Sequence, residues 1–329
     1  MTDFDKLFAD FSNLRVAVIG DIMLDTYWWG KVDRISPEAP VPVVALSKKE
    51  YRIGGAGNVA LNTISLGAET ALFSVTGDDE DADILMGLMQ EAHIDTKYML
   101  RSNKRITTNK IRIIGRNQQM MRLDAEITGY ISEENEDHLV SNFKEFVKQY
   151  QPAVVIFEDY NKGVLSETLI KRIIEICKEN NIVTAVDPKR KNFFSYKEAD
   201  IFKPNLHEVK EALNLLIDEA DLPALNNIHH ELHQIIKHHI SIITLSEKGI
   251  FIQKENFSRI IPAHVRNIAD VSGAGDTVIG VASLVYASAK DVVLSAEVAN
   301  IAGGLVCEQV GTAAINKERL YKECKALLG

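Results

Sequence analysis

The chain has 329 residues, of which 46% are hydrophobic and 25% charged, a balance typical of folded globular proteins and not of disordered ones. Aspartate and glutamate total 46 against 37 lysine and arginine, and the net charge of −9 argues against a nucleic-acid partner. No apolar run is long enough to span a membrane, and the N-terminus is acidic where a signal peptide would be basic. The three cysteines show no metal-binding spacing. We therefore expect a cytoplasmic protein with no membrane or nucleic-acid partner.

Short apolar runs alternate with longer helical patterns along the chain, which is typical of βαβ units and a parallel sheet. Buried strands are predicted at residues 15–21, 70–75, 153–159, 182–187 and 241–245. Helices are predicted at residues 58–66, 81–92, 132–151, 166–180, 206–215, 274–288, 291–309 and 317–328. Because buried parallel strands need helices on both faces, we predict a three-layer α/β/α sandwich with a mainly parallel sheet.

Two segments, at about 26–52 and 97–123, break this alternation with extended patterns that no helix covers. They predict a small β-sheet attached to the main domain as a lid. Such a sheet has an apolar face with nothing of its own to pack on, so it should cover a ligand or meet a second copy of the chain. We expect residues 1–329 to form one domain with this lid, and a homodimer through the lid.

The second of these segments has an unusual charge. Residues 101–123 contain seven basic side chains and no acidic one, namely Arg101, Lys104, Arg105, Lys110, Arg112, Arg116 and Arg122. One interpretation is a solvated strand edge protected by its charges, and the other is a site for an anion. On an extended ribbon Lys110, Arg112 and, after a turn at Gly115, Arg122 would point the same way. The arginine fork also suits phosphate oxygens.

A glycine-rich segment, residues 271–277 (VSGAGDT), precedes a helical pattern in the last third of the chain. Small residues at a helix start let an anion approach the unpaired backbone N–H groups. The segment is not a P-loop, because the required Lys-Ser/Thr pair is replaced by Val281 and Ala282. Asp276 is then either an ordinary N-cap or an acid placed beside a bound anion.

A second glycine-rich segment, residues 54–58 (GGAGN), also opens a predicted helix. Gly55, Gly57 and Ala60 match the dinucleotide-binding pattern G-x-G-x-x-A, and Asp78 follows at the distance expected of a ribose-binding acid. An NAD-dependent oxidoreductase is therefore an alternative. Against it, the motif does not follow the first buried strand, as that pattern requires.

Histidines are concentrated between residues 229 and 239. They do not form a zinc-protease motif, because Gln234 stands where H-E-x-x-H needs its second histidine. We expect His229 and His233 to lie on a helix that faces solvent.

Taken together, the two glycine motifs resemble, in order and spacing, the two signatures of the ribokinase-like (PfkB) carbohydrate kinases, and the similarity covers essentially the whole chain. Ser272 stands where the family usually has threonine. More narrowly, residues 34–44 (RISPEAPVPVV), 116–119 (RNQQ) and 122–124 (RLD) resemble the branch that phosphorylates D-glycero-β-D-manno-heptose 7-phosphate. That branch is often fused to a nucleotidyltransferase domain, and the end of this sequence at Gly329 leads us to expect the stand-alone form.

The resemblance implies a ribokinase-like fold and ATP-dependent phosphorylation of the anomeric hydroxyl of that sugar phosphate, a step towards ADP-heptose and the lipopolysaccharide core. It implies that Asp276 is the general base and that Gly273, Ala274 and Gly275 form the anion hole. On the nucleotide side it implies roles for Asn205, Leu206, His207, Glu208, Ser246 and Gly249, with Glu208 placing Mg²⁺ through water. On the acceptor side it implies Asp25, Gly54, Gly55, Asn58, Asp159 and Lys189. Lys110, Arg112 and Arg122 are candidates to bind the distal phosphate.

Three alternatives stay open besides the heptose kinase. A related kinase would act on another sugar phosphate or on a nucleoside. The NAD-dependent oxidoreductase would bind its cofactor at the first glycine motif. A non-catalytic sensor of sugar phosphates would keep the fold without the reaction, although the intact Asp276 argues against it.

Overall fold

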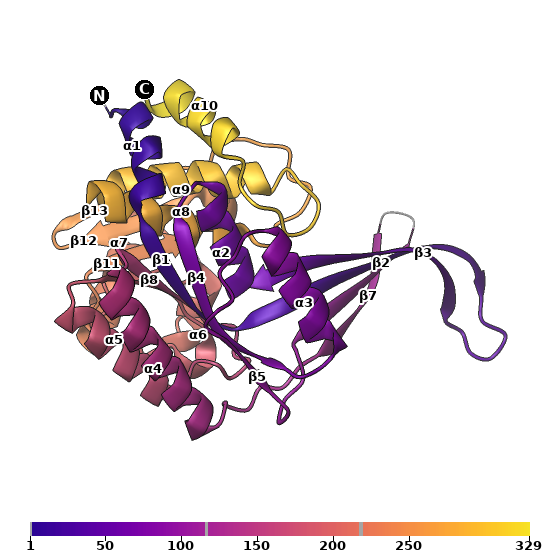
Figure 1. Ribbon diagram of the computed structural model, residues 1–329. Helices are drawn as coiled ribbons and strands as arrows, with labels where there is room; N and C mark the ends of the chain where they lie inside the picture. Colours follow the sequence, from indigo (N-terminus) through magenta and orange to yellow (C-terminus); the bar gives the residue numbers. More distant parts are fainter. Residues whose placement is uncertain (1, 116–117, 217–219) are drawn as a thin grey trace.

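A computed structural model describes residues 2–115, 118–216 and 220–329, and it shows a large sheet between two layers of helices (Figure 1). The large sheet has nine strands in the order β13-β12-β11-β10-β9-β8-β1-β4-β5. Its strands are β1 Arg15–Gly20, β4 Glu69–Gly77, β5 Met99–Ser102, β8 Val154–Glu158, β9 Val183–Asp187, β10 Ile201–Phe202, β11 Ile240–Thr244, β12 Ile250–Lys254 and β13 Phe257–Ile261. All neighbours pair in parallel except at β11-β12 and β12-β13. The predicted α/β/α sandwich with a mainly parallel sheet is confirmed.

The central strand β1 shows why both faces of this sheet need helices. Val16 and Val18 point into one hydrophobic core, and Ala17 and Ile19 point into the other. Because neighbouring residues of a strand face opposite sides, an almost wholly apolar strand must be covered twice.

Each core has its own layer of helices (Figure 1). The first core is covered by α1 Phe4–Asp10, α2 Ala56–Ser65, α3 Glu80–Glu91, α8 Ala274–Ala289, α9 Val292–Val306 and α10 Lys317–Leu328. The second is covered by α4 Glu133–Tyr150, α5 Glu167–Glu179, α6 Leu206–Ala212 and α7 Leu222–Ile236. None of the described helices is both long and apolar enough to cross a membrane.

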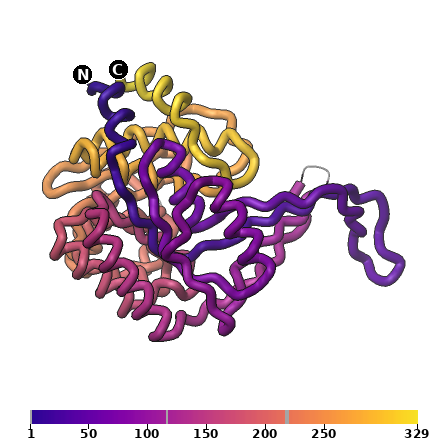
Figure 2. Tube along the Cα trace, viewed as in Figure 1, coloured from indigo at the N-terminus to yellow at the C-terminus, as the bar shows by residue number. Residues whose placement is uncertain are grey.

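A separate four-stranded sheet, in the order β3-β2-β6-β7, extends from the body as an arm (Figures 1 and 2). Its strands are β2 Ile22–Ile35, β3 Pro42–Gly55, β6 Asn109–Gly115 and β7 Gln118–Ala125. The predicted segment 97–123 is divided between the two sheets, because β5 pairs in parallel with β4 at the edge of the large sheet. The small sheet therefore takes its second pair of strands from residue 109 onward. Arg116 lies outside the described residues.

The histidine-rich segment differs from its prediction. His229 on α7 is only 7% exposed and His238 is fully buried, and both contact the Ser241 hydroxyl, at 2.8 and 2.6 Å. The expectation of a helix whose histidines face solvent is therefore wrong for His229. Helical spacing places His229 on the apolar face of α7, where a polar partner from β11 lets the ring be buried.

Candidate active site

The two glycine motifs meet at the carboxyl ends of the parallel strands. The strand order reverses at β1, which lies between β4 and β8, and ligands of open α/β sheets bind at such a point. Helices α2 and α8 both begin here, each after a glycine and without a side-chain cap. Every other described α-helix begins with an Asp, Asn or Ser side chain that accepts a backbone N–H. The site thus combines two helix starts that lack a side-chain cap.

Asp276 lies in the first turn of α8 and is buried, with 2% of its surface exposed. Its Oδ2 accepts a hydrogen bond of 2.7 Å from Asn58 Nδ2, and its Oδ1 accepts one of 2.7 Å from the Tyr160 hydroxyl. Burial raises the pKa of Asp276, and the hydrogen bonds from Asn58 and Tyr160 oppose that rise. The predicted base and the predicted Asn58 are therefore in direct contact across 218 residues of sequence.

Gly273 makes this contact sterically feasible. Its φ of +77° lies in the left-handed region, and a Cβ at this position would lie 2.6 Å from Asn58 Nδ2. Beside it, the Ser272 hydroxyl donates to Asp270 Oδ1 at 2.8 Å, which gives the serine a partner within its own loop. The loop thus presents its small residues to the site and keeps its polar side chains bonded.

Two further carboxylates lie beside the base, Glu158 at the end of β8 and Asp187 at the end of β9. With Asp276 they bring three carboxylate oxygens within 4.8 Å of one another. Lys203 Nζ lies 2.7 Å from Asp187 Oδ2, whereas Asp187 Oδ1 and both oxygens of Glu158 have no hydrogen-bond partner among the described residues. Burial, and then the charges of Asp187 and Asp276, raise the pKa of Glu158 well above its usual value.

Glu158 and Lys203 were not predicted as site residues. The available signal was positional, because several of the predicted buried strands end in an acidic residue. Parallel strands gather their carboxyl ends at one edge of the sheet, so acids in these positions are expected to meet. The sequence does not reveal that Lys203, after β10, supplies their counter-charge.

Asp21 is another residue that the sequence analysis missed. It follows β1, is 1% exposed, and accepts backbone N–H groups from Tyr160, Lys162 and Val164 at 2.8–2.9 Å. Its own carbonyl accepts the N–H of Ala56 at the start of α2. One buried side chain thus holds the loop after β8 in register with the first glycine motif.

Asp159, predicted on the acceptor side, has partners for both carboxylate oxygens within the protein. Its Oδ1 accepts the N–H of Asn161, and its Oδ2 accepts hydrogen bonds from Asn192 Nδ2 and the Tyr196 hydroxyl. Burial and the nearby charge of Asp21 raise the pKa of Asp159 to about 6. These contacts make Asp159 a support of the loop that carries Tyr160.

The residues predicted for the nucleotide lie together at the start of α6 and beside β11. Asn205, Leu206, His207 and Ser246 line one open pocket. Asn205 and Glu208 form a capping box, in which each side chain accepts the other residue's backbone N–H at 2.8 Å. Lys189, predicted on the acceptor side, instead forms an ion pair with Glu208. Gly249 (φ +99°) does not line the pocket but turns the chain where a Cβ would lie 2.0 Å from Ile261 O.

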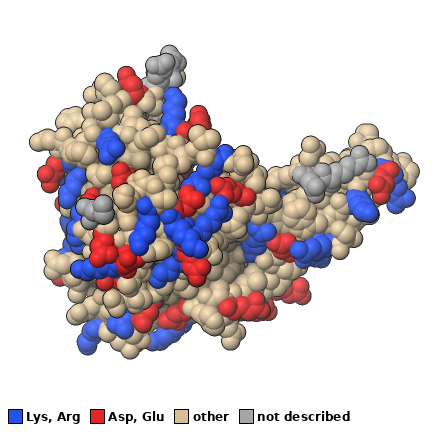
Figure 3. Space-filling model, turned by 90° about the horizontal axis from the view of Figure 1, so that it is seen from above, with Lys and Arg blue, Asp and Glu red and all other residues tan. Residues whose placement is uncertain are grey.

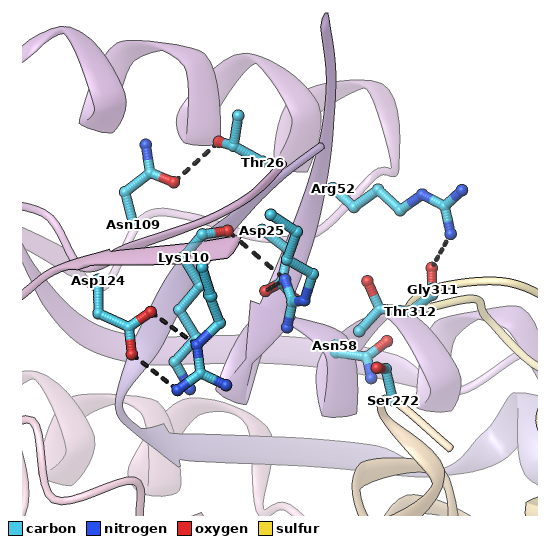
Figure 4. Close-up of polar contacts among 12 residues, drawn as sticks. Asp25, Thr26, Arg52, Asn58, Asn109, Lys110, Asp124, Ser272, Gly311 and Thr312 are labelled. Atoms are coloured by element: carbon cyan, nitrogen blue, oxygen red, sulfur yellow. Dashed lines mark hydrogen bonds and ion pairs between the residues drawn. The ribbon is translucent and has the colours of Figure 1, made fainter. Parts of the chain in front are cut away.

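The predicted acceptor side is formed by the base of the small sheet. Asp25 on β2 and Lys110 on β6 are register partners, and Figure 4 shows them with Asn58 and Ser272 from the two helix starts beside them. Arg112 NH1 lies 2.5 Å from Asp25 Oδ1. Gly54 is needed beside this carboxylate, because a Cβ there would lie 2.5 Å from Asp25 Oδ2. Gly55 (φ +59°) then turns the chain into α2.

Most of the basic residues in the acid-free window have acidic or carbonyl partners from outside it. Arg101 pairs with Asp78 and Asp83, Arg105 donates to the Lys162 carbonyl, Arg112 pairs with Asp25, and Arg122 pairs with Asp124. Lys110 and Arg112 alternate along β6 and Arg122 lies opposite Arg112, so these three share one face as expected.

Lys110 differs from these residues, because no ion pair to it exists among the residues the structure describes. Its ammonium group lies 5.1 Å from the centre of the Tyr160 ring. Burial lowers the pKa of Lys110, and the charge of Asp25 opposes that change. A half-buried ammonium beside the site, without a carboxylate of its own, is suited to meet an anionic ligand.

The NAD alternative lacks its structural context. The first glycine motif follows β3 of the small sheet, which runs antiparallel to β2, and not a parallel strand of the large sheet. Asp78, the candidate ribose-binding acid, is instead an ion-pair partner of Arg101 at 3.6 Å. A dinucleotide fingerprint needs the strand, the turn and the helix of one βαβ unit.

The mainly parallel sheet, the small lateral sheet and the paired helix starts define the ribokinase-like α/β fold. Escherichia coli phosphofructokinase-2 in complex with potassium superposes with a TM-score of 0.78 at 15% identity, covering 95% of this chain and 99% of that one. Arabidopsis thaliana ribokinase complexed with ribose and ATP superposes with a TM-score of 0.72 at 14% identity, covering 94% and 99%. At these identities the likeness concerns the fold alone.

The chain belongs to the pfkB family of carbohydrate kinases, whose sequence profile matches residues 13–319. It is 40% identical over 310 residues to the bifunctional protein HldE of Aliarcobacter butzleri, covering 94% of this chain and 64% of that protein. It is 41% identical over 313 residues to the bifunctional protein HldE of Methylobacillus flagellatus, covering 94% and 63%. The chain thus spans less than two thirds of these relatives. The prediction of an ATP-dependent sugar kinase is confirmed at the level of the family.

Proposed function

We propose that the chain transfers the γ-phosphoryl group of ATP to the anomeric hydroxyl of D-glycero-β-D-manno-heptose 7-phosphate, as a step towards ADP-heptose and the lipopolysaccharide core. The observation that carries the proposal is the buried Asp276 carboxylate, held by Asn58 and Tyr160 at an uncapped helix start. The resemblance of residues 34–44 to the heptose branch supports the acceptor, as does the 40% identity to the bifunctional protein HldE.

In this proposal Asp276 is the general base. It accepts the proton of the anomeric hydroxyl while that oxygen bonds to the γ-phosphorus and the bond from the γ-phosphorus to ADP breaks. The first turn of α8, at Gly273, Ala274 and Gly275, supplies backbone donors and the positive end of the helix dipole to the transferring group. Asn58 and Tyr160 each use one lone pair of the carboxylate, so each oxygen keeps another for the acceptor.

Mg²⁺ is expected to accompany ATP, and the side chains at the strand ends fit a hard divalent cation. The buried oxygens of Glu158 and Asp187 that lack donors are ligands of the type it prefers. Glu208, bonded to Lys189 and to the Asn205 N–H, would hold the ion through water. When bound, Mg²⁺ would neutralise charge on the nucleotide phosphates.

The distal phosphate of the acceptor needs cations away from the base. We assign Lys110 as its first ligand, because Lys110 has no carboxylate partner among the described residues. Arg122 is exposed and shares its charge with Asp124, so it can turn towards a phosphate at small cost. We assign Arg112 an indirect role in acceptor binding. Its ion pair with Asp25 orients that carboxylate, which is suited to bind sugar hydroxyls.

The arm is proposed to complete the site by pairing with a second copy of the chain. Its strands and the connection between β2 and β3 leave large apolar side chains exposed, among them Ile35 at 61%, Met121 at 56%, Val41 at 52% and Leu46 at 49%. The tube and space-filling views show the arm standing clear of the body (Figures 2 and 3). Exposed apolar surface on a sheet favours association, and a homodimer would cover it. The cytoplasmic location stays a prediction.

The test is a panel assay. The purified chain receives ATP, Mg²⁺ and one of several sugar phosphates, free sugars or nucleosides, while ADP release is measured and the phosphorylated position is identified by phosphorus NMR. We expect turnover with the heptose 7-phosphate and a product phosphorylated at its anomeric oxygen. A second arm measures the thermal shift with ATP and with NAD, because a ligand that binds the folded state raises its melting temperature.

Each outcome has a definite meaning. Faster turnover of another sugar phosphate or of a nucleoside would change the proposed acceptor but would retain the proposed kinase activity. A thermal shift with ATP but no turnover of any acceptor would favour the non-catalytic sensor. A shift with NAD and none with ATP would overturn the nucleotide assignment altogether.

A further inference from the structure

Tyr160 directly contacts the proposed base. It lies in the loop after β8, and its hydroxyl donates to Asp276 Oδ1 at 2.7 Å. Asn58, from the opposite side of the site at the start of α2, donates to Oδ2 at the same distance. One donor on each oxygen fixes the rotation of the carboxylate, which a single donor would leave free to turn.

The surroundings of Asp276 make this restraint necessary. Glu158 from β8 and Asp187 from β9 bring carboxylate oxygens within 4.8 Å of it, and both carry the same charge when ionised. The Lys203 ammonium is bonded to Asp187, and the charge of Lys189 acts on Glu158 and Asp187. Like charges at this distance repel, so the Asp276 carboxylate needs neutral donors to stay in place.

Three contacts hold Tyr160, one through its backbone and two through its ring. Its backbone N–H donates to Asp21 Oδ2 at 2.9 Å, which anchors the loop to the end of β1. The ammonium groups of Lys110, from the small sheet, and Lys189, from the nucleotide side, lie 5.1 and 5.4 Å from the ring centre. Both distances are typical of cation–π contacts. Groups from the small sheet and from the nucleotide side therefore fix the orientation of the phenol.

We propose that Tyr160 is a positioning residue for the catalytic base: its hydroxyl, together with the Asn58 amide, holds the Asp276 carboxylate towards the acceptor hydroxyl. This inference rests on the proposed role of Asp276. In this role the phenol acts through the carboxylate that it orients. Removing the hydroxyl should therefore lower kcat and leave KM for ATP nearly unchanged.

The experiment is a double-mutant cycle that combines Tyr160→Phe with Asp276→Asn. In the parent chain, Tyr160→Phe should lower kcat about 10–100-fold, the range for a hydrogen bond to a charged group, with KM for ATP changed less than about 3-fold. In the Asp276→Asn background the same substitution should change kcat by less than about 3-fold, because its target is gone. Thermal melts and the ATP-induced thermal shift verify that every variant folds.

Tyr321→Phe is the matched control. The Tyr321 hydroxyl on α10 also donates to a carboxylate, that of Asp5 on α1, but neither residue belongs to the site. We expect this substitution to leave kcat within about 3-fold. Equal losses from Tyr160→Phe in both backgrounds, or no loss in either, would overturn the positioning role. Normal turnover of Asp276→Asn alone would instead refute the proposed function, so the two failures are distinguishable.

Discussion

The carboxyl edge of the large sheet and the outer half of the small sheet differ in what surrounds their side chains. At the edge of the large sheet, Glu158, Asp187 and Asp276 are buried, and Asn58, Tyr160 and Lys203 hold two of these acids in place. On the arm, Ile35 and Met121 are more than half exposed. The first region is held by its own hydrogen bonds and ion pair, whereas the second presents apolar side chains to solvent. The residues proposed to catalyse the reaction lie in the first region.

The strongest test of the first region is Asp276→Asn. The substitution keeps the shape of the side chain but removes the proton acceptor, so we expect kcat to fall by about 10²–10⁴-fold. The ATP-induced thermal shift should persist, because the nucleotide pocket at Asn205 and Ser246 is untouched. Steady-state kinetics and a thermal-shift titration check both statements. Turnover close to that of the parent chain would show that the buried acid is structural.

The next largest effect is expected where the two regions meet, at Lys110. Lys110→Ala should raise KM for a phosphorylated acceptor by about 10–100-fold, because a charge-assisted contact is lost, and change KM for ATP by less than about 3-fold. Lys104→Ala is the control, since Lys104 belongs to the same basic window and is exposed. Equal increases in KM for both ligands would argue that Lys110 only supports the Tyr160 ring.

Acid stability tests the packing of α7 against the start of β11. Burial lowers the pKa of His229 to about 4 and that of His238 to about 3. Below pH 6.5 these two histidines bind protons in the unfolded chain but not in the folded chain, so they contribute a loss of stability as the pH drops. Asp159, whose pKa is raised to about 6, contributes in the opposite direction. At pH 5 this costs on the order of 2 kcal/mol for His238, and His229 adds a loss in the same direction.

The check is urea unfolding between pH 5 and pH 8. We expect His238→Phe, which keeps a ring against Phe202, to flatten the loss of stability at low pH. His239→Gln is the control, because His239 is largely exposed beside Asp200. A loss of stability towards pH 5 that is as steep in His238→Phe as in the parent chain would contradict the prediction.

The smallest change in turnover is expected from charges placed on the arm. Met121→Glu with Leu123→Glu should convert a dimer into a monomer, because a buried unpaired charge opposes association. Light scattering coupled to gel filtration measures the assembly state. The same change on α10, Leu327→Glu, is the control, since that side chain is 45% exposed on the body. A parent chain that is monomeric at assay concentration would remove the proposed role of the arm.

The sequence predicted the fold well because the fold follows from local patterns. Val16 and Val18 alternate with Ala17 and Ile19, and this apolar run already implies a strand covered on both faces. The strands at β10 and β12–β13 were not predicted, since two-residue pairing and a hairpin at a sheet edge leave weak periodicity. Asp276 and the glycines before it were recognisable because their spacing is local.

Contacts between distant segments were decided only by the tertiary structure. Nothing in residues 101–123 shows that Arg101 and Arg112 pair with acids elsewhere in the chain, or that Lys110 has no ion-pair partner in the described part of the chain. The sequence also does not show that Tyr160 contacts Asp276. The loop after β8 carries Tyr160 to the base, and Asp21, from a distant segment, anchors that loop. Spacing along the chain determines which reactive residues a motif contains. The packing of the strand ends determines which of these side chains contact one another.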